Sequence, residues 1–150
     1  MQVRLGNRQD EPIIKTIVSQ CLAENAAADK QLADLTDIET NYFWHNGIFI
    51  VAEDDGQIVG VAGARGNDNQ ETLELVRLFV VPARRGRGVA RELLNTVFFF
   101  AEGLEYKRVV AYPEKQGLKP GKTVLGFSPD PAKPGAWFKS VSAGNRAPQL

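Results

Sequence analysis

The chain has 150 residues, 43% of them hydrophobic and 24% charged, with 18 basic and 18 acidic side chains. This length predicts one domain, residues 1–150, and the balanced charge offers no basic field for nucleic acid or an anionic membrane. A single cysteine and a single histidine exclude an internal disulfide and a histidine-cluster metal site, so no metal is expected. The first residues lack a signal-peptide core, and no run reaches the ~18 apolar residues of a membrane span, which predicts a cytoplasmic protein.

The first 46 residues predict a short strand followed by two helices. Residues 3–5 are the strand candidate, and Asp10 is a candidate helix N-cap before Pro12. Helical spacing predicts one buried stripe made of Ile13, Ile14, Ile17, Val18, Cys21 and Leu22. Apolar residues between positions 26 and 38 predict a second helix, either continuous or broken near Thr36-Asp37. It ends in an aromatic cluster of Tyr42, Phe43 and Trp44 with His45 beside it.

The middle of the chain predicts three consecutive antiparallel strands. They are expected at residues 48–53, 57–65 and 71–81. Asp54-Asp55-Gly56 is typical of a tight hairpin between the first two. Gly60 and Gly63 lie inside the second strand, where glycine indicates a bulge or a close backbone approach.

Pro82 ends the third strand, and apolar residues from Val89 to Leu104 then recur with helical spacing. Phe98 and Phe99 widen the apolar face of this helix, which predicts burial on more than one side.

The last part of the chain is predicted from its β-rich and its Pro- and Gly-rich runs. Strands are expected at residues 106–112 and 136–141, an irregular segment at 113–136 and a polar tail at 142–150. The order of elements predicts a mixed α/β (α+β) fold, with a largely antiparallel central sheet flanked by helices.

The turn between the third strand and the long helix is rich in arginine and glycine, Arg85-Gly86-Arg87-Gly88-Val89-Ala90. Backbone N–H groups converge at the positive end of the helix that follows, and guanidinium groups strengthen the preference for an anion. The dinucleotide fingerprint is excluded because Arg91 stands where its third small residue belongs. The turn therefore predicts a phosphate site, with a solvated surface loop as the alternative.

The pattern Arg85-x-x-Gly88-x-Ala90, after a strand and a Val-Pro pair, resembles motif A of the GNAT superfamily of N-acetyltransferases, written R/Q-x-x-G-x-G/A. The ELVRLFV strand, the ARELLNTV helix and the IFIVAEDDGQIVGVAG hairpin also resemble the family, which extends the likeness to residues 1–142. The resemblance implies a GNAT-like sheet, acetyl-CoA as cosubstrate, and a small-molecule or peptide primary amine as acceptor. It also implies direct attack of that amine on the thioester in a ternary complex.

Carried over by position, the resemblance implies which residues bind the cosubstrate. The pyrophosphate falls on Arg85, Gly86, Arg87, Gly88, Val89, Ala90 and Arg91. The pantetheine arm would pair with the backbone of Leu78, Phe79 and Val80, as an added strand pairs with a sheet edge. A backbone N–H there would also stabilise the developing oxyanion of the thioester.

Glu74 lies eleven residues before Arg85, where several GNAT enzymes have a glutamate that acts as general base. An acceptor amine with a pKa of about 10 is mostly ammonium at neutral pH and must lose a proton before it attacks. A carboxylate in the cleft provides the base, and an exposed strand carboxylate is the alternative interpretation.

Arg77 lies on the same strand, where strict alternation places it on one face with Leu75 and Phe79. It is a candidate to bind a substrate carboxylate in a bidentate manner, or else to form a salt bridge at the sheet margin. Tyr42 and Trp44 either pack in the core or line the acceptor pocket, as the loop before the first central strand commonly does in this family.

Many GNAT enzymes have a tyrosine four residues before a Gly-Phe pair, where it protonates the leaving thiolate. Gly126-Phe127 is the corresponding pair here, but Lys122 stands in place of the tyrosine. Tyr112, at the end of the preceding strand, is a candidate substitute; solvent, or no acid at all, are the alternatives.

Two other functions fit the same residues. The first is a regulatory module of the same fold that binds CoA without transferring an acetyl group, and the second is a phosphate- or nucleotide-binding protein that uses only the arginine turn. The expected assembly is a monomer or a homodimer, because the Phe98-Phe99-Phe100 face and the last strand offer surfaces for pairing.

Overall fold

The computed structural model describes residues 1–26, 28, 30–67, 71–113 and 126–141. Within them, one sheet has the strand order β1-β2-β3-β4-β5-β7-β6, and only its β4–β5 pair is parallel. The strands are β1 (Gln2–Leu5), β2 (Ile48–Asp54), β3 (Gln57–Gly66), β4 (Thr72–Val80), β5 (Arg108–Ala111), β6 (Ser128–Pro129) and β7 (Trp137–Ser140). The helices are α1 (Glu11–Ala23), α2 (Ile38–Asn41) and α3 (Val89–Gly103). The predicted mixed, largely antiparallel fold is confirmed.

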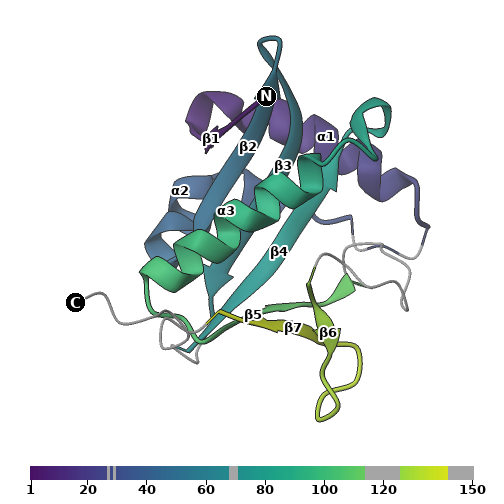
Figure 1. The fold of residues 1–150 in the computed structure, drawn as a ribbon. Coiled ribbons are helices and arrows are strands. Elements are labelled where there is room, and N and C mark those ends of the chain that lie inside the picture. The colour runs from purple at the N-terminus through teal and green to yellow at the C-terminus, as the bar shows by residue number, and fades with distance from the viewer. Residues whose placement is uncertain (27, 29, 68–70, 114–125, 142–150) are drawn as a thin grey trace.

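Helices cover both faces of the sheet. Figure 1 shows α3 across one face of β2, β3 and β4, with α1 and α2 behind the other face. The α3 face buries Leu73, Leu93 and Leu94, and the opposite face buries Ile14 and Phe49, among others. The central strands therefore pack between two apolar clusters, one on each face of the sheet. This packing fixes the position of β4, the strand that pairs with β5.

Helix α1 follows most of its predicted stripe. Ile14, Ile17, Val18, Cys21 and Leu22 are buried, whereas Ile13 is 51% exposed. The expectation for Ile13 was wrong because it lies at the edge of the stripe, beyond the surface that the sheet covers.

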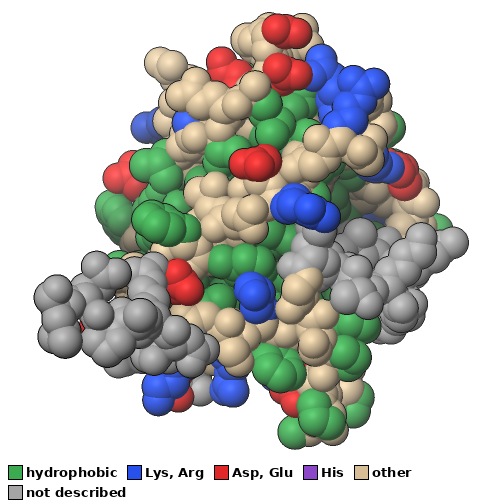
Figure 2. Space-filling view, viewed as in Figure 1, with side chains coloured by type: hydrophobic (Ala, Val, Ile, Leu, Met, Phe, Trp, Pro, Cys, Tyr) green, Lys and Arg blue, Asp and Glu red, His purple; other side chains and the backbone are tan. Residues whose placement is uncertain are grey.

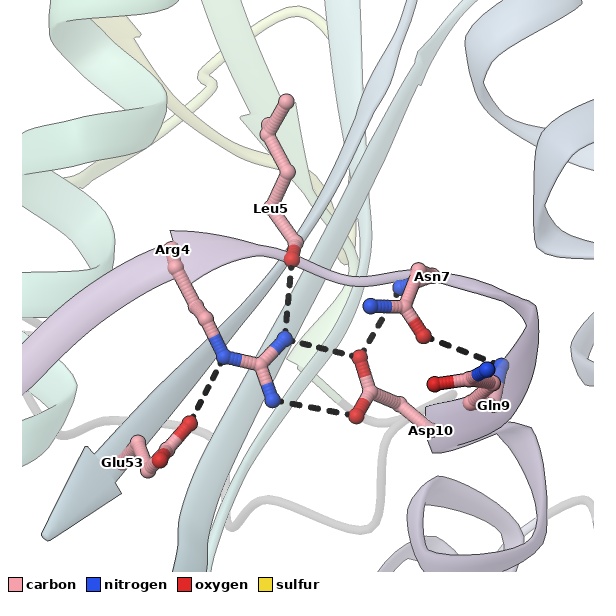
Figure 3. A network of polar contacts seen from close by, with 6 residues as sticks. All are labelled: Arg4, Leu5, Asn7, Gln9, Asp10 and Glu53. Carbon is pink, nitrogen blue, oxygen red and sulfur yellow. Dashed lines mark hydrogen bonds and ion pairs between the residues drawn. The ribbon is translucent and has the colours of Figure 1, made fainter. Parts of the chain in front are cut away.

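Asp10 precedes α1 as predicted, but it does not cap the helix with its side chain. Its carboxylate instead accepts from the Arg4 guanidinium at 2.8 and 3.0 Å and from the Asn7 N–H at 2.9 Å, as Figure 3 shows. The Arg4 hydrogen bonds lower the pKa of Asp10 most, and Arg4 also donates to Glu53 of β2 at 2.7 Å. This network fixes the start of α1 to the first two strands of the sheet.

Residues 30–45 do not form one continuous helix, and the interruption lies at Thr36 and Asp37, where the sequence indicated a break. They form short turns of 3-10 helix at Ala33–Leu35 and Phe43–His45, with α2 between them. Asp37 starts α2 by accepting the Thr40 N–H, and Asp34 turns its carboxylate toward Arg77 and Tyr42 instead of extending a helix. The local side-chain bond of Asp37 therefore starts a new helix at the break, while Asp34 bonds to a residue distant in the sequence.

The three central strands and their first hairpin are confirmed, with Asp55 at φ 52° and Gly56 at φ 75° in the turn. A bulge or a close backbone approach was expected at Gly60 and Gly63. Register shifts lie next to both, at Ala52/Glu53 opposite Gly60 and between Gly63 and Ala64, whereas the atoms nearest the two glycines belong to side chains. A Cβ at Gly60 would lie 2.8 Å from Val89 of α3, and one at Gly63 would lie 2.6 Å from Phe49. These two glycines let α3 and the Phe49 ring pack directly on β3.

A β-bulge interrupts β4. Gly63 pairs with Arg77 and Ala64 pairs with Leu75, so Val76 is an extra residue on β4. As a result Glu74 and Arg77 lie on the same face of the sheet, although they are three residues apart. The expectation that Leu75 shares a face with Arg77 was wrong, because Leu75 packs in the cluster under α3.

The C-terminal strands were expected at nearly the positions that β5 and β7 occupy, but β6 lies within the segment predicted to be irregular. On α3, Phe98 is buried and Phe99 is 72% exposed, so the helix is buried on one side only and that expectation was wrong. Residues 142–150, predicted as a polar tail, and Lys122 lie outside the described residues. Among the residues described, no helix is long and apolar enough to cross a membrane.

Candidate active site at the divergence of β4 and β5

The candidate site is organised by the point where β4 and β5 separate. Their parallel register runs from Thr72–Arg108 to Leu75–Ala111, whereas β4 itself continues to Val80. Figure 1 shows the two strands starting together and diverging toward their carboxyl ends. The predicted pantetheine-binding residues Leu78, Phe79 and Val80 lie on this extension of β4, which pairs with β3 but not with β5. An extended ligand can add to the sheet on the side that β5 leaves.

The turn after β4 leads directly into α3. Gly86 (φ 77°) and Gly88 (φ 84°) are left-handed, and Gly88 is the N-cap residue of α3, with no side-chain cap hydrogen bond. A Cβ built at either glycine meets no atom within 4 Å, so the space in front of this turn is open among the described residues. Open backbone at an uncapped helix N-terminus suits a phosphate group, whose negative charge the helix dipole favours.

Basic side chains gather over the same turn, as Figure 2 shows at the end of the molecule where α3 begins. Arg84 pairs with Asp54 and Arg85 pairs with Glu24. Within the described part of the chain, Arg87 and Arg91 form no ion pair and both are exposed. Their two charges are therefore available to a ligand at the start of α3.

The side chain of Arg85 ties α1 to β4. Its Nη1 and Nη2 donate to the Glu24 carboxylate, both at 2.7 Å, and its Nε donates to the Val80 carbonyl at 2.9 Å. It also contacts the Cys21 Sγ at 3.5 Å. Burial is the main reason that the pKa of the Cys21 thiol is raised, which keeps this sulfur a poor nucleophile.

Glu74 lies on the face of β4 opposite α3, paired in register with Arg65 of β3 and Val110 of β5. Its side chain is half-buried and forms no ion pair with any described residue. Glu74 lies one residue before the end of the paired β4–β5 segment. A carboxylate there can accept a proton beside the part of β4 that extends beyond β5.

Arg77 is already bound to a carboxylate of the chain. Its Nη2 lies 2.7 Å and its Nε 3.1 Å from the two Asp34 oxygens, and Nη2 also donates to the Gln31 carbonyl at 2.8 Å. Burial opposes the ionisation of Asp34, but hydrogen bonds from Arg77 and Tyr42 outweigh it and hold the pKa of Asp34 below its usual value. The structure thus shows the salt-bridge alternative for Arg77.

The two aromatic candidates lie in different environments. Tyr42 is fully buried, packs edge-on against Phe49 at 5.0 Å between ring centroids, and donates its hydroxyl to Asp34. Burial, followed by the Asp34 charge, raises the pKa of Tyr42, so this phenol stays protonated. Trp44 is 70% exposed. Tyr42 therefore fits the core-packing alternative, and it supports Arg77 through their shared partner.

Tyr112 follows the last residue of β5 on the same face as Val110 and Glu74. Its hydroxyl oxygen accepts a hydrogen bond from the Lys133 ammonium at 2.7 Å, and this ammonium also lies 5.2 Å from the centre of the Tyr112 ring. Glu74 and Tyr112, which were predicted separately, are thus brought to one face at the divergence of the strands. No group of metal-ligating side chains gathers within the described residues.

Sequence reasoning missed Asp34, Glu24 and Lys133. They lie 43, 61 and 21 residues from the partners that they bind, Arg77, Arg85 and Tyr112. No local spacing rule links residues so far apart, so only a signal that pairs distant positions would have found them.

Comparison with known proteins agrees with this geometry. A family model described as the Acetyltransferase (GNAT) family matches residues 18–118, which span β4, the glycine turn, α3 and β5. The chain belongs to the GNAT acetyltransferase family. Acetyl-CoA is the cosubstrate of this family.

Relatives of this GNAT chain include N-acetyltransferase 8F1 of Mus musculus, 33% identical over 132 residues that cover 85% of the chain and 54% of the relative. N-acetylaspartate synthetase of Homo sapiens is 40% identical over 78 residues, 51% of the chain and 26% of the relative. The chain spans about half the length of the first of these relatives.

Solved structures share the fold. A GNAT acetyltransferase from Staphylococcus aureus superposes with a TM-score of 0.73 at 19% identity, covering 94% of this chain and 99% of the other. A GNAT acetyltransferase from Brucella melitensis in complex with acetyl-CoA has a TM-score of 0.71 at 20% identity, covering 99% and 91%. At these identities the likeness concerns the fold.

Proposed function

We propose that this chain transfers an acetyl group from acetyl-CoA to a primary amine of a small molecule or peptide, by direct attack within a ternary complex. The observation that carries the proposal is the open extension of β4 beyond its register with β5, which leads directly into a left-handed glycine turn at an uncapped helix. Family membership and the solved complex of a Brucella melitensis family member with acetyl-CoA support the same donor.

The proposed donor site uses backbone more than side chains. The N–H groups of residues 86–91 and the guanidinium groups of Arg87 and Arg91 hold the phosphates, while Arg85 keeps the turn in place through Glu24 and Val80. Backbone groups of Leu78, Phe79 and Val80 take the pantetheine arm, and an N–H on this extension stabilises the thioester oxygen as it gains charge.

The proposed chemistry uses the face that carries Glu74 and Tyr112. Glu74 takes the proton that the acceptor ammonium must lose, either directly or through water. Tyr112 gives its phenolic proton to the departing thiolate. Cys21 takes no part, since it is buried and contacts the Arg85 side chain, so no covalent enzyme intermediate is expected.

The test is release of free CoA thiol from acetyl-CoA with a panel of amines. The panel contains L-aspartate, because a relative is named N-acetylaspartate synthetase, together with an alanyl peptide and the carboxylate-free amine spermidine. We expect thiol release that depends on one of these amines and a product heavier by one acetyl group in the mass spectrum. CoA binding without release over the whole panel would instead support a regulatory CoA-binding module.

A further inference from the structure

The loop between β6 and β7 forms a tightly bonded turn that holds Lys133. The Asp130 carboxylate accepts the Ala132 N–H at 2.9 Å, and the Asp130 carbonyl accepts the Lys133 N–H at 3.3 Å. The Asp130 N–H and the Ala136 carbonyl close the turn at 2.9 Å, and the Lys133 carbonyl accepts the Ala136 N–H at 3.1 Å. The backbone at Lys133 is thus fixed from both sides.

Strand register brings this turn to the end of β5. Trp137 pairs with Ala111, so the residues before Trp137 lie beside the residue after Ala111, which is Tyr112. The contact between the Lys133 Nζ and the Tyr112 hydroxyl oxygen, at 2.7 Å, follows from this register. An ammonium has only donors, so the phenol oxygen is the acceptor and the phenol keeps its own O–H as a donor.

We propose that Lys133 is a positioning residue for acetyl transfer, which holds the Tyr112 phenol on the face of the sheet that carries Glu74 and stabilises the charge that develops on its oxygen. The proposal rests on the proposed function, because it presupposes that Tyr112 protonates the leaving thiolate. A hydrogen bond from a charged donor stabilises an oxygen that gains negative charge more than one from a neutral donor does. The Lys133 ammonium therefore stabilises the Tyr112 phenolate and favours proton transfer from Tyr112 to sulfur.

The proton and electron balance of the step is complete. The acceptor nitrogen bonds to the carbonyl carbon, the carbon–sulfur bond breaks with its electron pair on sulfur, and the phenolic proton of Tyr112 moves to sulfur. The acceptor nitrogen loses two protons in all. Glu74 passes the first, from the ammonium, to water before the attack. It takes the second as the carbon–nitrogen bond forms and returns it through water to the phenolate, which Lys133 stabilises meanwhile. The net result is an N-acetylated amine, free CoA thiol, one proton released to water and unchanged enzyme groups.

The charges around Lys133 keep it in the ammonium form. The hydrogen bond to the Tyr112 hydroxyl has the largest effect, and the carboxylates of Glu74 on β4 and Asp130 in its own turn act in the same direction. Together they raise the pKa of Lys133 above its usual value. At neutral pH, well below the usual lysine pKa of about 10.4, Lys133 is therefore an ammonium.

The kinetic test uses the full chain, acetyl-CoA and the amine of fastest turnover in the panel. We expect Lys133→Met to lower kcat about tenfold with an unchanged KM for acetyl-CoA, and Lys133→Arg to recover most of it. In a Tyr112→Phe background, Lys133→Met should have no further effect. Lys139→Met is the matched control, because Lys139 lies on β7 over the Phe98 ring, away from Tyr112.

A second measurement needs no donor or acceptor. In ligand-free protein labelled with ¹³C-lysine, the Lys133 side-chain signal, assigned by its loss in Lys133→Met, should titrate at lower pH in Tyr112→Phe than in the unmutated chain. The Lys139 signal should not move. An identical Lys133 titration in both proteins would contradict the contact on which the proposal depends.

The outcomes separate the two proposals. Two results would overturn the role of Lys133 and leave the acetyltransferase proposal standing. One is an unchanged kcat in Lys133→Met. The other is that Lys133→Met lowers kcat by the same factor in the Tyr112→Phe background as in the unmutated chain. Absence of thiol release by the unmutated chain with every amine overturns both.

Discussion

Glu74 is the residue on which the proposed proton removal depends. It is half-buried at the edge of the paired β4–β5 segment, on the face shared with Tyr112. We expect Glu74→Gln to lower kcat about 100-fold at pH 7, because a general base contributes roughly that much. The loss should shrink as pH rises toward about 10, where the amine is already deprotonated.

The measurement for Glu74 is the kcat profile from neutral to alkaline pH, with Glu71→Gln as control on the exposed residue just before β4. Equal profiles for the unmutated chain and Glu74→Gln would remove Glu74 from the mechanism.

Asp34 and Arg77 form the buried ion pair of the candidate site, with side chains 15% and 10% exposed. Asp34→Ala leaves the Arg77 charge and the Tyr42 hydroxyl without this partner, so we expect the free energy of unfolding to fall by about 3 kcal/mol. Denaturant unfolding at neutral pH measures it. Lys107→Ala, which breaks the exposed Lys107–Glu71 pair, should cost about 0.5 kcal/mol. Similar losses for both variants would contradict the structural role of Asp34.

The same pair predicts how stability depends on acid. The folded pKa of Asp34 lies below its unfolded value, so its stabilisation is complete above the unfolded pKa of about 4. It is lost as pH falls through the lower folded pKa. The difference in unfolding free energy between the unmutated chain and Asp34→Ala should therefore be constant from pH 7 to about 5 and narrow toward pH 2 to 3. A difference that stays constant down to pH 2 would contradict the shift.

Among the elements, the turn into α3 is the most specific for its ligand. Gly86 and Gly88 are left-handed with open space around them, so an added Cβ meets no clash and the cost comes from backbone conformation alone. We expect Gly86→Ala and Gly88→Ala each to lower the free energy of unfolding by about 1 kcal/mol and to weaken CoA binding.

Gly103, the last residue of α3, is the matched control, because it is exposed and does not have a positive φ. Gly103→Ala should leave CoA binding unchanged and raise stability by about 0.5 kcal/mol. Thermal unfolding and calorimetric titration with CoA measure both properties. Unchanged CoA binding in Gly86→Ala and Gly88→Ala would show that the turn does not hold the phosphates.

Strand β4 shows how one irregular residue rearranges an element. Helix positions and strand order followed from hydrophobic spacing and turn residues, and α1, α3 and the three central strands agree with that reading. The residues of β4 themselves carry no signal of a bulge, because LELVRLFV reads equally well as a regular strand, and the glycines that indicated one lie on β3. The extra residue Val76 changed which side chains share the face with Arg77.

For the whole molecule, the donor site predicts a large response to CoA in a chain whose net charge is zero. CoA at about 100 times its dissociation constant should raise the free energy of unfolding by about 2.7 kcal/mol. For a domain of this size, this corresponds to a rise in Tm of roughly 5–10 °C. ATP and AMP at equal concentration should give a smaller rise. Replacing both Arg87 and Arg91 by alanine should reduce the CoA effect. A rise with ATP but none with CoA would contradict a CoA site.

The sequence alone determined the donor half of this protein. The order of strands, the turn at Arg85-Gly86-Arg87-Gly88 and the helix after it depend on local preferences, because glycine conformation and helix periodicity act over a few residues. The resemblance of these segments to motif A of the GNAT superfamily then indicated the family and acetyl-CoA.

Only the tertiary structure decided how the other side chains are used. Asp34 binds Arg77, Glu24 binds Arg85 and Lys133 binds Tyr112. The two residues of each pair are far apart in the sequence and become neighbours only in the folded chain. Charge pairs of this kind depend on which strands and turns become neighbours, and on the bulge that sets the face of β4. The residues proposed to transfer protons, Glu74 and Tyr112, and their neighbour Lys133 therefore come together only when the sheet has formed.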